Sequence, residues 1–307
     1  MDNKTCAEQS YKPTRFRCVL QKTALALLNF FRVRDWCHVL GLSFLGFVYA
    51  YASQSLFPSL LLSFIASSLY IAHGYSLNET IDAQVATKCL ESEFKDKKGI
   101  SFKTALILSY TPLLINLVFS VLFYRNILPF IIVGALLAYF YSAAPFRFKS
   151  VPFMDLVVNS AGFSILFLIG YCSLKPLDKN SLLITVLFFL LFIPLQLIHE
   201  LAHFEKDKSE KAVTTVVRYG IPASLKLFFI SLLPFTIWPL FLWHLQVLSI
   251  YVFLLSALFS AYIFLRFGKT LKNRVNINMN DLRIHARFLT IFYGLCLLFI
   301  LMKSSKM

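Results

Sequence analysis

Long apolar runs dominate the chain and restrict the architectures open to it. Each run is long enough for a helix to cross about 30 Å of hydrocarbon at about 1.5 Å per residue. A helix satisfies its own backbone hydrogen bonds inside a bilayer, so the runs predict membrane-spanning helices. The nine predicted spans cover residues 36–56, 57–77, 103–124, 127–145, 152–173, 181–203, 221–243, 245–267 and 286–303. The predicted fold class is therefore an all-α, polytopic membrane protein.

Composition agrees with this fold class. The 307 residues are 58% hydrophobic and only 15% charged, which excludes an ordinary soluble domain. The net charge of +15 would be compatible with nucleic acid, but the basic residues form short clusters between apolar runs. Membrane topology accounts for that arrangement better. We therefore expect membrane lipids as surroundings and no nucleic acid as a partner.

The basic residues also predict the orientation. Of the 30 Lys and Arg residues, all but five lie in the N-terminal segment or in every second loop. The positive-inside rule then places the N-terminus in the cytoplasm and the C-terminus on the opposite side. We expect one membrane domain over residues 1–307, with a cytoplasmic segment at 1–27 and a nine-helix bundle around a central cavity at 28–303. The expected location is a bacterial inner (cytoplasmic) membrane.

Two predicted helices end in acidic residues, which are costly in a membrane and favour a functional cavity. On the second helix, just past the predicted span, Asn78 and Asp82 are four residues apart and share a face, with Glu79 beside them. At the end of the sixth, Glu200 and Asp207 lie about 20° apart around the helix axis. Two oxygen-rich faces at one depth suit a hard cation such as Mg²⁺, which would hold phosphate oxygens. The alternative is two solvated helix ends with ordinary surface charge.

The same stretch of the sixth span contains His199-Glu200-Leu201-Ala202-His203, which matches the H-E-x-x-H pattern of zinc proteases. In that interpretation His199 and His203 bind zinc, Glu200 is the general base, and a third ligand comes from elsewhere. The sequence offers no partner motif for that third ligand. A zinc protease is therefore the less favoured interpretation.

A basic loop lies between the fourth and fifth predicted spans. It runs from Tyr141 through Arg147 and Lys149, and Pro145 and Pro152 stiffen it. Such a loop can clamp an anion, because Arg binds phosphate through two parallel hydrogen bonds. The positive-inside bias explains two basic residues equally well.

Two further polar residues, Asp155 and Asn159, are four residues apart inside the fifth predicted span. Polar groups at such positions face the interior of a bundle. Asp155 is close enough in sequence to hold Arg147 or Lys149 in place.

Together these elements resemble the UbiA superfamily of intramembrane prenyltransferases over residues 28–303. That family has nine helices, with Asp-rich motifs on the second and sixth. The stretch from Asn78 to Asp82 resembles N-D-x-x-D-x-x-x-D, with Glu79 in place of the first Asp and Ala86 in place of the last. The acidic positions of the second motif, D-x-x-D-x-x-x-D, are occupied by Glu200, His203 and Asp207. The loop YSAAPFRFK resembles the family's Y-S-x-P-P-x-R-x-K.

The resemblance implies a Mg²⁺-dependent enzyme that moves an isoprenoid chain from an isoprenyl diphosphate to an aromatic or lipid acceptor. The implied metal ligands are Asn78, Glu79, Asp82, Glu200 and Asp207. The implied substrate-binding residues are Asn78, Tyr141, Arg147 and Lys149, and the implied catalytic residues are Asp82, His203 and Asp207. For His203, three roles stay open, namely metal ligand, general base and packed polar contact.

The substitutions within the motifs leave two other functions open. One is the transfer of a phosphoribosyl group or another phosphosugar to a polyprenyl phosphate in the same scaffold. The other is a non-catalytic lipid-binding protein with a decayed metal site.

Overall fold

The computed structural model describes residues 25–51, 56–88, 90–209, 212–273 and 279–304. These residues form helices, turns and loops, and no strand occurs among them. After a helical stretch at 25–30, the elements are α2 (Val33–Trp36), η1 (Cys37–Leu40), α3 (Gly41–Ala50), α4 (Leu56–Ala86), α5 (Glu91–Lys98), α6 (Phe102–Phe123), η2 (Arg125–Ile127), α7 (Leu128–Ser142), η3 (Phe148–Ser150), α8 (Met154–Cys172), α9 (Lys179–Ser209), α10 (Thr215–His244), α11 (Ile250–Asn273) and α12 (Met279–Ser304).

The prediction of an all-α membrane bundle is confirmed. Within the described residues, eight helices are long and apolar enough to cross a membrane. The first predicted span, residues 36–56, is instead divided into η1 and the ten-residue α3, and residues 52–55 lie outside the described part. The predicted count of nine spans is therefore not confirmed.

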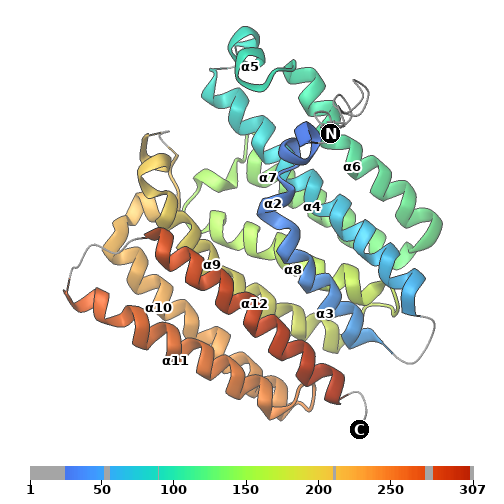
Figure 1. The fold of residues 1–307 in the computed structure, drawn as a ribbon, viewed down its shortest axis with the longest axis vertical. Coiled ribbons are helices and arrows are strands. Elements are labelled where there is room, and N and C mark those ends of the chain that lie inside the picture. Colours follow the sequence, from blue (N-terminus) through green and yellow to red (C-terminus); the bar gives the residue numbers. More distant parts are fainter. Residues whose placement is uncertain (1–24, 52–55, 89, 210–211, 274–278, 305–307) are drawn as a thin grey trace, which may run out of the picture.

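The long helices form a closed arrangement (Figure 1). The contacts run from α3 to α4, from α4 to α6 and α7, from α7 to α8, and onward through α9, α10, α11 and α12. The arrangement closes because α12 contacts both α9 and α3. Thr214 begins α10 by accepting a hydrogen bond from the backbone N–H of Val217 at 3.3 Å. Its hydroxyl thereby caps the first turn of α10.

The close packing of α3 on α8 depends on two glycines. A Cβ atom at Gly46 would lie 2.0 Å from the backbone oxygen of Phe167, and one at Gly170 would lie 1.9 Å from the backbone oxygen of Ser43. Backbone atoms cannot move aside as a side chain can, so only glycine allows this approach. Small residues at such contacts are how helices pack tightly in membranes.

Two helices extend beyond the predicted spans. The prediction ended the second span at residue 77 and the sixth at 203, whereas α4 continues to Ala86 and α9 to Ser209. The acidic motif residues therefore lie on continuous helix, so their order around each helix axis is fixed by helical geometry.

Candidate active site

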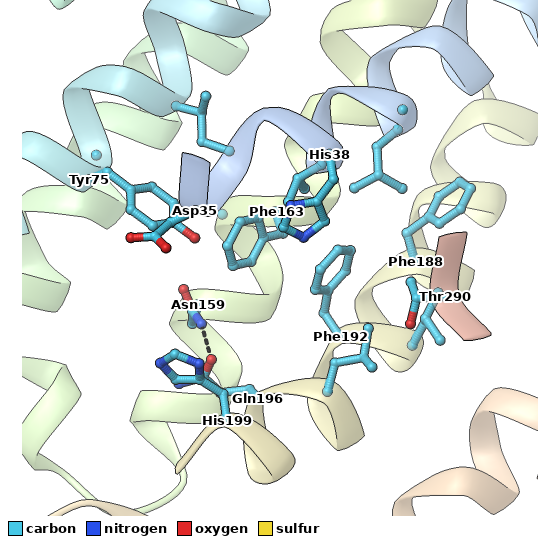
Figure 2. A pocket seen from close by; sticks show the side chains of 18 of the residues that line it. Asp35, His38, Tyr75, Asn159, Phe163, Phe188, Phe192, Gln196, His199 and Thr290 are labelled. Carbon is cyan, nitrogen blue, oxygen red and sulfur yellow. Dashed lines mark hydrogen bonds between the residues drawn. The ribbon is translucent and has the colours of Figure 1, made fainter. Parts of the chain in front are cut away.

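A cavity of about 550 Å³ lies between α2, η1, α3, α4, α7, α8, α9 and α12. Polar groups gather at one end, where Asp35, Tyr75, Asn159, Gln196 and His199 lie near one another (Figure 2). Elsewhere the wall is formed mainly by aromatic and aliphatic side chains, among them Phe163, Phe188 and Phe192, with His38 and Thr290 between them. The cavity therefore joins a polar end to an apolar end, as an amphiphilic substrate requires.

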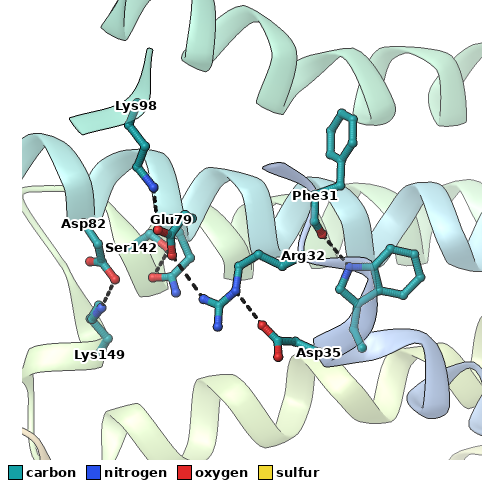
Figure 3. A network of polar contacts seen from close by, with 10 residues as sticks. Phe31, Arg32, Asp35, Glu79, Asp82, Lys98, Ser142 and Lys149 are labelled. Carbon is teal, nitrogen blue, oxygen red and sulfur yellow. Dashed lines mark hydrogen bonds and ion pairs between the residues drawn. The ribbon is translucent and has the colours of Figure 1, made fainter. Parts of the chain in front are cut away.

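Of the α4 motif, Asn78 reaches the cavity, whereas Glu79 and Asp82 are not among the residues that line it. Asn78 lines the cavity, and its side-chain oxygen accepts a hydrogen bond from the hydroxyl of Ser142 at 3.3 Å. One residue later, Glu79 lies between two cations, with Lys98 at 2.6 Å and Arg32 at 3.2 Å (Figure 3). Arg32 also contacts Asp35 at 2.7 Å and lies over the ring of Tyr75. A chain of alternating charges thus links α4 to α2 and α5.

The basic loop meets the same helix. Asp82 accepts hydrogen bonds from Arg147 at 3.3 Å and from Lys149, so both cations of the loop converge on one carboxylate. Figure 3 shows the Lys149 contact directly. Tyr141, at the start of this loop, lines the cavity. The structure therefore brings together the first acidic motif and the basic loop, which are about 65 residues apart in sequence.

The sequence suggested that Asp155 holds Arg147 or Lys149 in place. In the structure these two cations contact Asp82 instead. Asp155 is buried and accepts hydrogen bonds from the backbone N–H and the hydroxyl of Thr215, and from the backbone N–H of Leu156. These bonds attach α8 to the first turn of α10. The two cations bind Asp82 because the loop folds back over α4 instead.

Glu200 lies apart from the α4 acids. Its side chain is 3% exposed, accepts a hydrogen bond from Gln196 at 3.1 Å, and shares a hydrogen bond with Asp155. The second carboxyl oxygen, Oε2, is also buried, and the backbone N–H of Val216 in the first turn of α10 lies towards this carboxyl group. Two carboxyl groups can share a hydrogen bond only if one carries a proton. One proton is therefore held between Glu200 and Asp155.

The other residues of the α9 motif are more accessible than Glu200. His199 lines the cavity, and its ring lies against that of His203 with centroids 4.6 Å apart. His203 and Asp207 are partly exposed towards the end of α9. Lys206 acts electrostatically on Glu79, so the ends of α4 and α9 lie near each other.

The donor set can be compared with what a hard divalent cation needs. Asn78, Glu79 and Asp82 offer an amide oxygen and two carboxylates that are about one-third exposed, and Asp207 adds an accessible carboxylate from α9. These oxygen donors fit Mg²⁺ in type. Glu200 does not fit, because its carboxyl is directed towards Asp155. Within the described residues, no three His, Cys, Asp or Glu side chains converge as a metal cluster. The α4 carboxylates contact cations instead.

Some residues of the site were not predicted from the sequence. Lys98 contacts Glu79, and Gln196 joins Glu200 to the cavity wall. The signal for Gln196 is its spacing: it is a polar residue within an apolar span, four residues before Glu200 and hence on the same helix face. Lys98 has no such signal, because its contact depends on how α5 folds back towards α4.

Comparisons with known proteins agree with this geometry. A family model described as the UbiA prenyltransferase family matches residues 39–284. Comparison with curated proteins finds no match. Among solved structures, one described as digeranylgeranylglyceryl phosphate synthase in membranes superposes with a TM-score of 0.72 at 16% identity, covering 92% of this chain and 99% of that one.

Two other solved structures are of a UbiA homolog from Archaeoglobus fulgidus, one bound to DMAPP and Mg²⁺ and one to GPP and Mg²⁺. Both have a TM-score of 0.68 and cover 89% of this chain and 99% of their own, at 19% and 20% identity respectively. At this level of identity the likeness shows a shared fold.

Proposed function

Because the chain belongs to the UbiA prenyltransferase family, a family of intramembrane enzymes, we propose that it moves an isoprenoid chain from an isoprenyl diphosphate to an aromatic or lipid acceptor, with Mg²⁺ as cofactor. One observation carries the proposal. A single cavity runs from Asn78 and Tyr141 at its polar end to the stacked rings of Phe163 and Phe192 at its apolar end. An isoprenyl diphosphate has the same two parts, a charged head and an apolar chain.

The charged head would lie between the two basic groups of the loop and the α4 motif. Arg147 and Lys149 now bind Asp82, and a diphosphate offers them stronger acceptors of the same charge. Asn78 and Tyr141 line the cavity beside them and would complete the hydrogen bonds to the diphosphate. The solved relatives bound to DMAPP and to GPP support an isoprenyl diphosphate as the donor.

Asn78, Glu79, Asp82 and Asp207 would hold Mg²⁺, which neutralises charge on the leaving pyrophosphate when bound. The protein's own cations share that task, because Arg147 and Lys149 stabilise the negative charge that grows as the C1–O bond breaks. The roles of His203 as ligand, base or packed contact remain alternatives within this proposal.

Breaking the C1–O bond leaves an allylic cation, which needs stabilisation in a dry environment. Phe163 and Phe192 lie with ring centroids 4.8 Å apart and both line the cavity. Their faces attract a cation, an interaction worth about 2 kcal/mol when desolvated. The acceptor then bonds to C1 and gives up its proton to water at the polar end.

The direct experiment uses the purified chain in lipid nanodiscs with labelled dimethylallyl and geranyl diphosphates. With an aromatic or lipid acceptor added, we expect binding of the donor and release of pyrophosphate in the presence of Mg²⁺, loss of both with EDTA, and recovery when Mg²⁺ is restored. Unlabelled phosphoribosyl diphosphate should not compete. Donor binding that is unchanged by EDTA would contradict the metal-dependent mechanism. Effective competition by phosphoribosyl diphosphate would favour the phosphosugar-transfer alternative.

The orientation of the protein in the membrane and the identity of that membrane are also proposals. We propose that the N-terminus is cytoplasmic and that the membrane is a bacterial inner membrane, with the polar end of the cavity on the cytoplasmic side. The asymmetry of the Lys and Arg residues supports this orientation.

A further inference from the structure

The interface between α8 and α9 has a regular order of side-chain pairs along the cavity wall. Nearest the polar end, the side-chain N–H of Asn159 donates to the oxygen of Gln196. One turn further, Phe163 stacks on Phe192 with an interplanar angle of 16°. Asn159 and Gln196 are therefore the last polar pair before the aromatic wall, at the place where a charged head and an apolar chain would meet.

A series of buried hydrogen bonds connects this amide pair to the interior of the bundle. Gln196 donates to Glu200 at 3.1 Å, Glu200 shares a hydrogen bond with Asp155, and Asp155 accepts from Thr215 at the start of α10. All four residues are buried, with at most 8% exposure. This polar chain thus runs from α10 through α8 and α9 to Asn159.

These hydrogen bonds fix the orientation of the Asn159 side-chain amide. Since Gln196 uses its NH₂ group on Glu200, its oxygen faces Asn159, and Asn159 must turn its own NH₂ group towards that oxygen. The carbonyl oxygen of Asn159 then points away from Gln196, towards the end of the cavity where Tyr75 and Asp35 lie (Figure 2). The pair therefore offers the cavity a fixed hydrogen-bond acceptor.

We propose that Asn159 recognises the acceptor substrate through a hydroxyl group, which donates to the carbonyl oxygen of Asn159. A ligand that covers this oxygen without a donor leaves it desolvated and unpaired, whereas a phenol or an alcohol satisfies it. Gln196, Glu200, Asp155 and Thr215 are positioning residues, which act through Asn159. The assignment rests on the proposed function, and it narrows the acceptor to hydroxyl-bearing molecules, bound beside Phe163 and Phe192.

Matched ligands that differ only by methylation of their hydroxyl groups test the assignment. The purified chain would be titrated with 1-naphthol and 1-methoxynaphthalene, and separately with 1-O-octylglycerol and its dimethyl ether, in the presence of Mg²⁺ and a non-hydrolysable geranyl diphosphate analogue. We expect roughly tenfold tighter binding of the hydroxyl form in at least one pair, as one hydrogen bond to a partly buried amide provides. The pair that shows the preference identifies the acceptor as phenolic or as a lipid alcohol.

Asn159→Leu and Gln196→Leu should each abolish that preference, and Asn159→Ala replaces Asn159→Leu if the larger side chain prevents folding. The matched control is Asn116→Leu. Asn116 is a buried Asn on α6 that donates to the backbone of Ala66, away from the cavity lining. This variant should keep the wild-type preference.

Equal binding of both members in both pairs would overturn the assignment, and so would a preference that survives in Asn159→Leu and Asn159→Ala. Binding of the diphosphate analogue, measured in the same samples, tests the proposed function separately. If the analogue fails to bind wild-type protein while the hydroxyl preference still depends on Asn159, the proposed function fails alone. If the analogue binds and no preference exists, the assignment of Asn159 fails alone.

Discussion

Glu200 of α9 shares a hydrogen bond with Asp155 of α8, and both carboxyl groups are buried within the bundle. The pair joins α8 and α9 to the start of α10 through Thr215. Glu200 nevertheless occupies the first acidic position of a motif that resembles a metal-binding motif. We therefore propose that the acids of the site differ in role, with those of α4 and Asp207 as metal ligands and Glu200 as part of the buried polar network.

This separation predicts the effect of substitutions at Glu200. Glu200→Gln should keep activity within about threefold of wild type, because its NH₂ group can donate to Asp155 and its oxygen can still accept from Gln196. Glu200→Ala should lower the thermal unfolding temperature, since it leaves buried polar groups unpaired at a cost of about 1–3 kcal/mol. Both are measured by a transfer assay and by thermal unfolding in detergent. A loss of activity in Glu200→Gln as large as that in Asp82→Asn would restore Glu200 as a metal ligand.

The acids assigned to the metal should behave differently. Asp82→Asn and Asp207→Asn should each lower the rate of pyrophosphate release by at least about 100-fold, because each removes a charged ligand that helps to stabilise the leaving group. Their unfolding temperatures should stay close to that of wild type, since Asn preserves the side-chain volume. The control is Asp96→Asn on the exposed side of α5, which should be fully active. Activity in either Asp82→Asn or Asp207→Asn equal to that of Asp96→Asn would exclude that acid from the metal site.

His203 can be tested by restoring the acid that the motif resemblance implies. We expect His203→Asp to keep pyrophosphate release and to reach half-maximal rate at a lower Mg²⁺ concentration, because a carboxylate is a better ligand for Mg²⁺ than an imidazole. His203→Leu serves as the comparison, since it offers neither a ligand nor a base. Normal donor ionisation with complete loss of transfer in both variants would instead assign His203 as a base.

The glycines between α3 and α8 predict a large effect on stability without any change in polar chemistry. Gly170→Ala places a Cβ atom against the backbone of Ser43, so the two helices must separate. We expect a cost of about 1–3 kcal/mol and a clearly lower unfolding temperature. Gly294→Ala on α12 is the matched control, because nothing lies within 4 Å of its Cβ position. Similar unfolding temperatures for the two variants would show that α3 is not packed as described.

The proposed orientation is tested by proteolysis in sealed vesicles. Lys97 on α5 and Lys208 near the end of α9 are both exposed. With a cytoplasmic N-terminus, trypsin should cut at both residues in inside-out vesicles and at neither in right-side-out vesicles. Mass spectrometry of the released peptides identifies the sites, and cleavage with the reverse preference would invert the topology.

Local features of the sequence account for much of this protein. The apolar runs predicted the helices, because a chain in hydrocarbon must satisfy its backbone within the helix itself. The predicted span at 221–243 agrees with α10, in which Gly220 interrupts the helical conformation with a φ of 77°. Asn78 and Asp82 share a face of α4 for the same reason, since a spacing of four residues sets their relative direction whatever surrounds them.

Only the tertiary structure decided which partners those side chains meet. Asp82 binds Arg147 and Lys149 because the loop after α7 folds back over α4, and Asp155 binds Thr215 because α10 begins beside α8. The burial of Glu200 likewise depends on how the neighbouring helices α8 and α10 pack on one side of α9. Helical periodicity is a short-range property that the sequence displays directly. Whether a given helix face meets a metal, lipid or a buried partner depends on how the helices pack together. No local sequence pattern encodes that packing.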